Sequence, residues 1–480
     1  MDIKELLDSE KIGQLTEIFS SKKPVFEMTP EKAVKQYDVD GHDVHNKSKR
    51  KPKIIKKDTG SVDELGKPIL ATVSIDVNRV GIPFQKLIVE RRVGFALSTP
   101  VTYRISSANA DDEQAKKLIQ AVNDIQDDNK MAFKNKEILR RLMSEMEVAE
   151  IWYFAESDKD QIGKELELNM KILSPDLGDK LYPLFDAVGD MIAFARGYKV
   201  TDDKKVQTEH FDIYTNEAEY HYINKSSTWI KDPDIPINPI PNKVHKIMIV
   251  YYSQNQPEWY NVQDMIGRLE TLYSNHADSN DYFGAPMLLV SGEVEGYAQK
   301  GEQGKIMQLS PGADAKYLAL QNEPQSITAE EANLERLIYT MSQTPNIDFE
   351  AVKSLGNLSG VALRLMFLDA HMAVKCKEEI FGIGLQRRVN IIKACIGTVL
   401  DTSLNAVVPT TKILPIITPY LPDNDSEMIN NISAAYSSGI LSKKTSVERN
   451  PLVSDPDKEV EQIDQEVTGQ IETPIQKVTL

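Results

Sequence analysis

Cysteine is scarce in this sequence: Cys376 and Cys395 are the only two among 480 residues. Both fall within one expected helix, 19 residues apart, which corresponds to about 28 Å at the rise of an α-helix. A disulfide cannot span that distance, so we expect two reduced, structural thiols. Two cysteines placed in this way also exclude a cysteine-based metal quartet.

Long apolar runs and an excess of positive charge are missing as well. The best candidate for a membrane span, Val361 to Val374, is interrupted by Arg364, Asp369 and His371. The first residues are acidic where a signal peptide would be basic and then apolar. Lys and Arg total 56 against 72 Asp and Glu, a net charge of −16. We therefore expect a soluble, unexported chain whose surface is not built mainly to neutralise phosphates.

Signatures of catalysis and of cofactor binding are weak. The segment Gly301 to Ile306 has glycines and a lysine, but its spacing is too short for a phosphate-binding loop and Ile306 replaces the Ser or Thr that would hold magnesium. His42 and His45, with Asp40 and Asp43, are candidate metal ligands, although a solvated polar loop is the favoured interpretation. The sequence therefore predicts no cofactor, no metal site and no enzyme, and an unrecognised hydrolase stays as a remote alternative.

Proline is absent between Pro345 and Pro409. Because proline is excluded from helix interiors, this stretch predicts a long helix from Val361 to about Leu400. Gly382 and Gly384 weaken that helix, so we expect it to be kinked between them.

Before this helix, apolar periodicity separates helical from strand segments. Helical spacing or composition predicts helices over Met1–Phe19, Pro30–Tyr37, Val77–Ala96, Asp111–Asn129 and Lys134–Met146. Alternation predicts strands over Ile69–Ile75, Val148–Ala155, Leu166–Ile172, Leu181–Phe185, Met191–Tyr198, Glu209–Tyr214, Glu219–Ile223 and Lys246–Tyr252, with a proline-rich loop from 233 to 241.

Two further helices flank a compact module at residues 285–323. Pro257 suits the first position of a helix that ends before Gly284. Thr328 and Glu331 have the spacing of a capping box at the start of the second helix, which Pro345 ends. The rest of the chain predicts a return strand and three short helices: Lys412–Leu421, Glu427–Ser438, Lys443–Asn450 and Asp457–Val467.

Residues 47–57 are the most conspicuous charge cluster, with seven basic side chains in eleven positions. Such a run is usually an exposed, solvated arm. Contact with DNA or with a capsid protein is the alternative, and its candidate residues are Lys49, Arg50, Lys51 and Lys53.

Several of these segments, taken in order, resemble the portal proteins of tailed bacteriophages. The resemblance rests on short motifs over residues 70–467: Phe84-Gln-Lys-Leu-Ile-Val89, Thr99-Pro-Val-Thr-Tyr103, Ile172-Leu-Ser-Pro175, Phe194-Ala-Arg-Gly-Tyr198, Ser279-Asn-Asp-Tyr-Phe283 and Leu358-Ser-Gly-Val-Ala-Leu363. Each motif is weak by itself, and their shared order makes the set specific.

The resemblance implies an α+β portal fold with an α/β wing, a two-helix stem, a small α/β clip, a long kinked helix and an α-helical crown. The implied division is: N-terminal region with the basic arm 1–68, wing 69–256, first stem helix 257–284, clip 285–326, second stem helix 327–347, tunnel loop 348–360, long wing helix and return strand 361–424, crown 425–467 and tail 468–480.

The resemblance also implies a function. Portal proteins form a ring, a dodecamer in virions, at one capsid vertex; double-stranded DNA is packaged and ejected through it. The implied partners are terminase, head-completion or adaptor proteins, and the major capsid and scaffolding proteins, with assembly in the host cytoplasm. Tunnel-loop residues Lys353, Ser354 and Asn357 would contact DNA, and the clip residues for partners would be Glu293, Glu295, Lys300, Glu302 and Lys305. The alternatives are another virion head or adaptor protein, or a nucleic-acid-binding protein that uses the basic arm.

Overall fold

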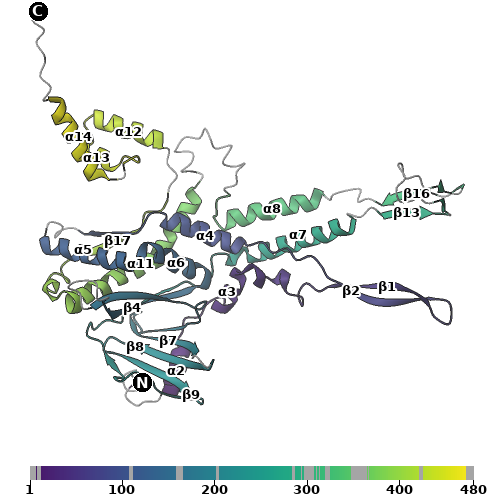
Figure 1. Ribbon diagram of the computed structural model, residues 1–480, viewed down its shortest axis with the longest axis horizontal. Helices are drawn as coiled ribbons and strands as arrows, with labels where there is room; N and C mark the ends of the chain where they lie inside the picture. The colour runs from purple at the N-terminus through teal and green to yellow at the C-terminus, as the bar shows by residue number, and fades with distance from the viewer. Residues whose placement is uncertain are drawn as a thin grey trace, which may run out of the picture.

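Figure 1 shows the computed structural model of the chain: a body of helices and sheets from which two projections extend in the same direction. The structure describes residues 7, 12–106, 112–157, 166–201, 205–283, 287–292, 294–296, 308–309, 311–312, 314–318, 325–346, 365, 367–420, 425–453 and 455–471. Helices and strands are segregated along much of the chain, so the predicted α+β class is confirmed.

The centre of the body is a helical layer packed on a three-stranded antiparallel sheet of order β12-β4-β5. Their shared core contains Trp152, Tyr252, Phe381 and Leu385, all buried. The strands are β4 (Glu147–Glu156), β5 (Leu166–Leu173) and β12 (Ile249–Ser253), and the helices are α4 (Phe84–Leu97), α5 (Glu113–Asp128), α6 (Met131–Glu145) and α11 (Leu368–Cys395).

A second sheet continues the body, with order β10-β9-β8-β7-β6 and β11 paired with β9. Helix α2 (Ile12–Ser21) covers it, with the ring of Phe19 6.0 Å from that of Phe211. The strands are β6 (Lys180–Phe185), β7 (Met191–Thr201), β8 (Gln207–Tyr214), β9 (Ala218–Lys225), β10 (Thr228–Lys231) and β11 (Ile240–Pro241). The sequence predicted β6 to β9 but missed β10 and β11, which are short and lie beside or within the proline-rich stretch.

The first projection is a helix pair that leads to a small strand module (Figure 1). It contains α7 (Gln263–Phe283) and α8 (Gln325–Met341). The described residues of the module form two antiparallel strand pairs. In these, β13 (Met287–Ser291) pairs with β16 (Asp314–Leu318), and β14 (Val294–Gly296) pairs with β15 (Gln308–Leu309).

The second projection is an antiparallel hairpin of β1 (Lys53–Val62) and β2 (Pro68–Ile75). Strand β2 was predicted. Strand β1 was not, because its lysines made the basic run resemble an unstructured arm. The expected boundary between residues 68 and 69 divides this hairpin.

Near the C-terminus, β17 (Ile413–Ile416) pairs with β3 (Thr102–Ile105) and continues to three helices. The Ser442 hydroxyl accepts the Thr445 N–H at 3.2 Å and so caps α13. The helices are α12 (Asp425–Ser437), α13 (Lys443–Glu448) and α14 (Pro456–Ile471).

Several predicted helix starts are wrong. Helix α6 begins at Met131 instead of Lys134. Helix α4 begins at Phe84 instead of Val77, because Pro83 cannot lie inside a helix, although Val80 has the spacing of its apolar residues. Helix α7 begins at Gln263 instead of Pro257, because Trp259 turns into the core and a 3-10 turn, Tyr260–Val262, precedes the helix. Helix α8 begins at Gln325, so Thr328 lies inside the helix and does not cap it.

A buried ion pair joins α11 to the central sheet. The Glu150 carboxylate accepts hydrogen bonds from Arg388 Nε at 2.9 Å, Tyr252 OH at 2.6 Å and Trp152 Nε1 at 3.0 Å. Arg388 also donates to Asn135 Oδ1 at 2.7 Å, and both charged side chains are fully buried. Two buried charges are tolerated here because each has several partners.

Helix α11 runs unbroken through Gly382 and Gly384, and the two glycines have different surroundings. A Cβ at Gly384 would overlap the ring of Tyr252, whereas a Cβ at Gly382 would have nothing within 4 Å. Gly384 therefore lets α11 approach the strand that carries Tyr252, a packing role that the kink hypothesis did not include.

We predict opposite effects for alanine at these two positions. Gly384→Ala should lower the free energy of unfolding by about 1–3 kcal/mol, because the packed Tyr252 ring must move. Gly382→Ala is the matched control and should raise it by about 0.5–1 kcal/mol, because alanine favours a helix. Urea unfolding followed by circular dichroism measures both, and equal effects of the two substitutions would contradict the close-approach role of Gly384.

Candidate functional site

The helix pair α7–α8 is anchored in the body at one end and projects at the other (Figure 1). The first half of α7 buries Ile266 and Leu269, and α8 buries Ile338. In the same half of α7, Arg268 Nη2 lies 2.9 Å from Glu330 Oε1, and further along His276 Nδ1 lies 3.5 Å from Glu331 Oε1, so polar contacts also join the two helices. The pair is therefore a rod with an apolar root and a more polar shaft.

One face of α7 carries four oxygen-bearing side chains, Glu270, Ser274, Asp278 and Asp281, which we call the polar ladder. Their spacing of four, four and three residues places them on the same side of the helix. Each accepts a hydrogen bond from residues 42–82, the segment that contains the hairpin. The ladder therefore attaches a long N-terminal segment to the rod.

The root of the ladder is buried. Glu270 Oε1 lies 2.5 Å from His42 Nδ1 and accepts the Ile82 N–H at 2.9 Å. Burial alone would lower the pKa of His42, but the hydrogen bond and charge of Glu270 outweigh it and raise the pKa above its ordinary value. Ser274 Oγ accepts the Val80 N–H at 2.9 Å. These bonds satisfy backbone donors of the segment before α4, while Pro83, which cannot lie inside a helix, sets the start of that helix at Phe84.

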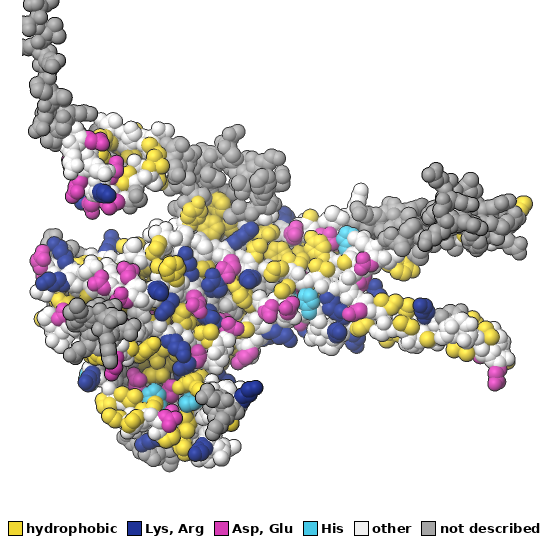
Figure 2. Space-filling model, viewed as in Figure 1, with side chains coloured by type: hydrophobic (Ala, Val, Ile, Leu, Met, Phe, Trp, Pro, Cys, Tyr) yellow, Lys and Arg dark blue, Asp and Glu magenta, His cyan; other side chains and the backbone are white. Residues whose placement is uncertain are grey.

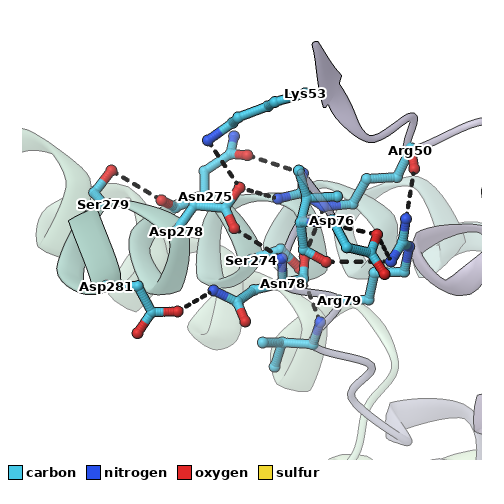
Figure 3. A network of polar contacts seen from close by, with 12 residues as sticks. Arg50, Lys53, Asp76, Asn78, Arg79, Ser274, Asn275, Asp278, Ser279 and Asp281 are labelled. Carbon is cyan, nitrogen blue, oxygen red and sulfur yellow. Dashed lines mark hydrogen bonds and ion pairs between the residues drawn. The ribbon is translucent and has the colours of Figure 1, made fainter. Parts of the chain in front are cut away.

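The outer part of the ladder holds the base of the hairpin (Figure 3). Asp278 accepts the Asn78 N–H at 2.7 Å and lies 3.0 Å from Arg50 Nη2 and 3.2 Å from Lys53 Nζ. Arg50 also donates to Asn275 Oδ1 at 2.9 Å. Burial would raise the pKa of Asp278, but the Asn78 N–H and the two cations outweigh it and lower the pKa below its usual value.

The four basic residues predicted to contact DNA or a capsid protein differ in their partners within the chain. Arg50 and Lys53 bind Asp278, which lies more than 200 residues away in the sequence, and Lys49 pairs with Asp43. Lys51 is exposed. Sequence reasoning missed Asp278 because a single aspartate in a helix gives no signal of a distant basic partner.

The expected tunnel loop and most of the expected clip residues lie outside the described residues. This holds for Lys353, Ser354 and Asn357, and for Glu293, Lys300, Glu302 and Lys305. Glu295 belongs to strand β14.

The segment that leads into the expected loop is described, and two arginines of α4 hold it. Arg92 Nη2 donates to the Ser342 carbonyl at 2.6 Å, and Arg91 donates to the Pro345 carbonyl. Arg92 and Lys377 share the buried carboxylate of Glu258. Burial, with the nearby charge of Arg92, lowers the pKa of Lys377 to about 8. The segment that follows α8 is therefore held against a charged part of the body.

Comparison with known proteins identifies the family. Residues 31–473 match the family described as "Phage portal protein, SPP1 Gp6-like". The chain belongs to this family. The portal protein of Bacillus phage SPP1 is 21% identical over 407 residues, which cover 81% of this chain and 76% of that protein. The predicted resemblance to phage portal proteins is therefore confirmed.

Membership makes the chain a structural component of a bacteriophage capsid vertex. The family match begins at residue 31, well before the residue 70 at which the sequence motifs began, so the basic run and the hairpin both lie inside the family region. Among the described helices, none is both long and apolar enough to span a bilayer. In the same part of the chain, no three His, Cys, Asp or Glu side chains form a metal-binding group.

We predict that Asp278→Asn loosens the hairpin base. The variant keeps the shape of the side chain but loses the charge that binds Arg50 and Lys53, and charge-assisted hydrogen bonds are worth about 1.5–3 kcal/mol. Hydrogen exchange at the amide of Asn78 should accelerate about tenfold or more. Asp281→Asn is the matched control. Its contact in the ladder is with the side-chain amide of Asn78 and not with the backbone N–H whose exchange is measured.

The contact between Asp278 and the hairpin base should weaken at low pH. Because the folded pKa of Asp278 is lowered, its contribution is complete above the unfolded pKa of about 3.9 and disappears as the pH falls through the lower folded value. Equal exchange at Asn78 in the wild type and Asp278→Asn at pH 7 would show that the charge does not hold the hairpin.

Proposed function

We propose that this chain forms a closed ring at one vertex of the capsid and that double-stranded DNA enters and leaves the capsid through the ring. The match to the portal family over residues 31–473 carries this proposal. The elongated shape supports it, because an anchored rod with a small module at its end suits a subunit that stands beside identical copies around a channel (Figure 1).

A closed ring requires head-to-tail contacts, in which one patch of each subunit meets a different patch of the next. The proposed ring is a dodecamer in the virion, as in other members of the family. Twelve copies at −16 each carry a charge of about −190. An acidic lumen would repel DNA and let it slide, whereas a basic groove would retain it.

The strand module at the end of the rod is the proposed docking site for terminase during packaging, and later for head-completion or adaptor proteins. Its candidate contact residues are Glu293, Glu295, Lys300, Glu302 and Lys305, whose polarity suits partners that exchange. The body would face the major capsid and scaffolding proteins. In this scheme terminase hydrolyses ATP, and the portal chain is a conduit without catalysis of its own.

The alternative of a nucleic-acid-binding protein that uses the basic run is less favoured. Arg50 and Lys53 are engaged by Asp278, so part of the run is neutralised within the chain.

Negative-stain electron microscopy of the purified protein tests the ring. We expect circular particles with an axial hole wide enough for a DNA duplex. A protein that stays monomeric, or forms only closed dimers, at micromolar concentration would contradict the proposal.

The proposed DNA contact at Lys353 has a separate test. Lys353→Glu should leave ring assembly intact and reduce the DNA packaged per head, because a carboxylate replaces a transient phosphate contact. Lys353→Arg is the control and should package normally. DNA content of purified heads measures the effect, and unchanged packaging by Lys353→Glu would remove this residue from the mechanism.

A further inference from the structure

The β1–β2 hairpin has almost no cover from its own chain. Every side chain of β2 is exposed, as is every described side chain of β1. Ile54 is 74% exposed and Leu65 at the tip is 82% exposed. Figure 2 shows apolar side chains along this projection, clear of the body.

The register of the hairpin sorts its residues onto two faces. Residues paired across the strands point to the same side, and residues two apart along a strand do so as well. Ile55 pairs with Val73, and Lys53 pairs with Ile75. One face therefore carries Ile55, Ile69, Ala71, Val73 and Ile75, with Lys53 and Lys57 at its margins on β1; we call it the apolar hairpin face. The opposite face is more polar, with Lys56, Thr72 and Ser74 beside Ile54 and Leu70.

An isolated two-stranded ribbon is at best marginally stable in water, since it buries too little apolar surface. Both strands are also edges of a two-stranded sheet, and proteins normally cover or blunt such edges. An exposed apolar face on such a ribbon is typical of an interaction surface.

The hairpin is nevertheless held in a defined conformation at both ends. At its tip, the Asp63 carboxylate accepts the N–H groups of Leu65 at 2.9 Å and Lys67 at 2.8 Å. At its base, Asp278 holds Arg50 and Lys53. A projection fixed in this way loses little conformational entropy when it binds, so it is preorganised for a partner.

We propose that the apolar hairpin face packs against the stem helices of a second copy of this chain, so that each subunit embraces the next around the ring. The inference deepens the proposed function and rests on its ring. The hairpin runs beside its own α7–α8 rod (Figure 1) and therefore reaches the place where the rod of the next copy would stand. It supplies one of the two unlike patches that a head-to-tail contact requires.

Charge supports a second copy as the occupant. Residues 47–57 carry seven positive charges and no negative one. Lys49, Arg50 and Lys53 are paired within the chain, and the other four are Lys47, Lys51, Lys56 and Lys57. Because the whole chain has a net charge of −16, the rest of each copy carries −16 − 7 = −23. The rod of that copy exposes the carboxylates of Asp264 and Glu335 beside Arg268 and Arg336, and Arg268 is already paired with Glu330. DNA is a poorer candidate, since phosphates attract the lysines but leave the isoleucines and the valine in water.

A matched pair of substitutions tests the assignment. Val73→Asp places a charge on the apolar hairpin face, and Ser74→Asp places the same charge on the opposite face one residue away. Both side chains are exposed, so both variants should fold like the wild type. Analytical ultracentrifugation over a dilution series measures the subunit concentration at which half of the subunits are in rings. Val73→Asp should raise this concentration at least tenfold. Ser74→Asp should stay within about twofold of the wild type.

Site-specific crosslinking identifies the occupant. A photoreactive group on Ile55→Cys, in a Cys376→Ser background that removes the exposed native thiol, should join neighbouring copies within purified rings. This inference would be overturned if Val73→Asp rings assembled as well as wild-type rings and Ile55→Cys gave no crosslink between copies. The proposed ring function would still stand in that case. Crosslinks found only to the capsid protein, in assembled heads, would overturn it as well. A wild-type chain that forms no rings would overturn both this inference and the proposed function.

Discussion

The polar ladder on α7 is the constraint on which the outer half of the molecule depends. Glu270 and Ser274 accept hydrogen bonds from the backbone N–H groups of Ile82 and Val80. Asp278 accepts one from the N–H of Asn78. These bonds fix the segment between the hairpin and α4, and so set the direction in which the hairpin leaves the body. One helix therefore positions both projections: it is half of the rod, and it is also the surface that holds the hairpin base.

The ladder is useful only if α7 itself is fixed, and the body provides this. Helix α11 is held against the central sheet by the buried pair of Arg388 and Glu150 and by the close approach at Gly384. Arginines of α4 hold the end of α8. Helix α7 buries Ile266 and Leu269 in the same core, so both helices of the rod leave it at defined positions. This rigidity suits a subunit whose ends must meet neighbouring copies in a repeating arrangement.

Local pattern predicted much of the fold, because periodicity and capping act over a few residues. Strands β4 to β9 follow from such signals. The errors had two sources. The early start predicted for α4 overlooked Pro83, a local signal that excludes a helix across it. At Lys53 a distant contact overrides the local pattern, because the lysine resembled part of a solvated arm yet pairs with Asp278. Of the candidate site, the sequence identified the basic residues but not the acidic face that binds them. The tunnel-loop residues stay predictions.

The functions proposed for the two projections require both to be parts of one ring wall. Electron cryomicroscopy of the purified assembly tests this most directly. The predicted map has rotational symmetry, with α7 and α8 of every copy around an axial channel and Ile55 and Val73 in contact with the adjacent copy. A map in which the rods point away from the axis, or in which the hairpin stands free in solvent, would contradict the account.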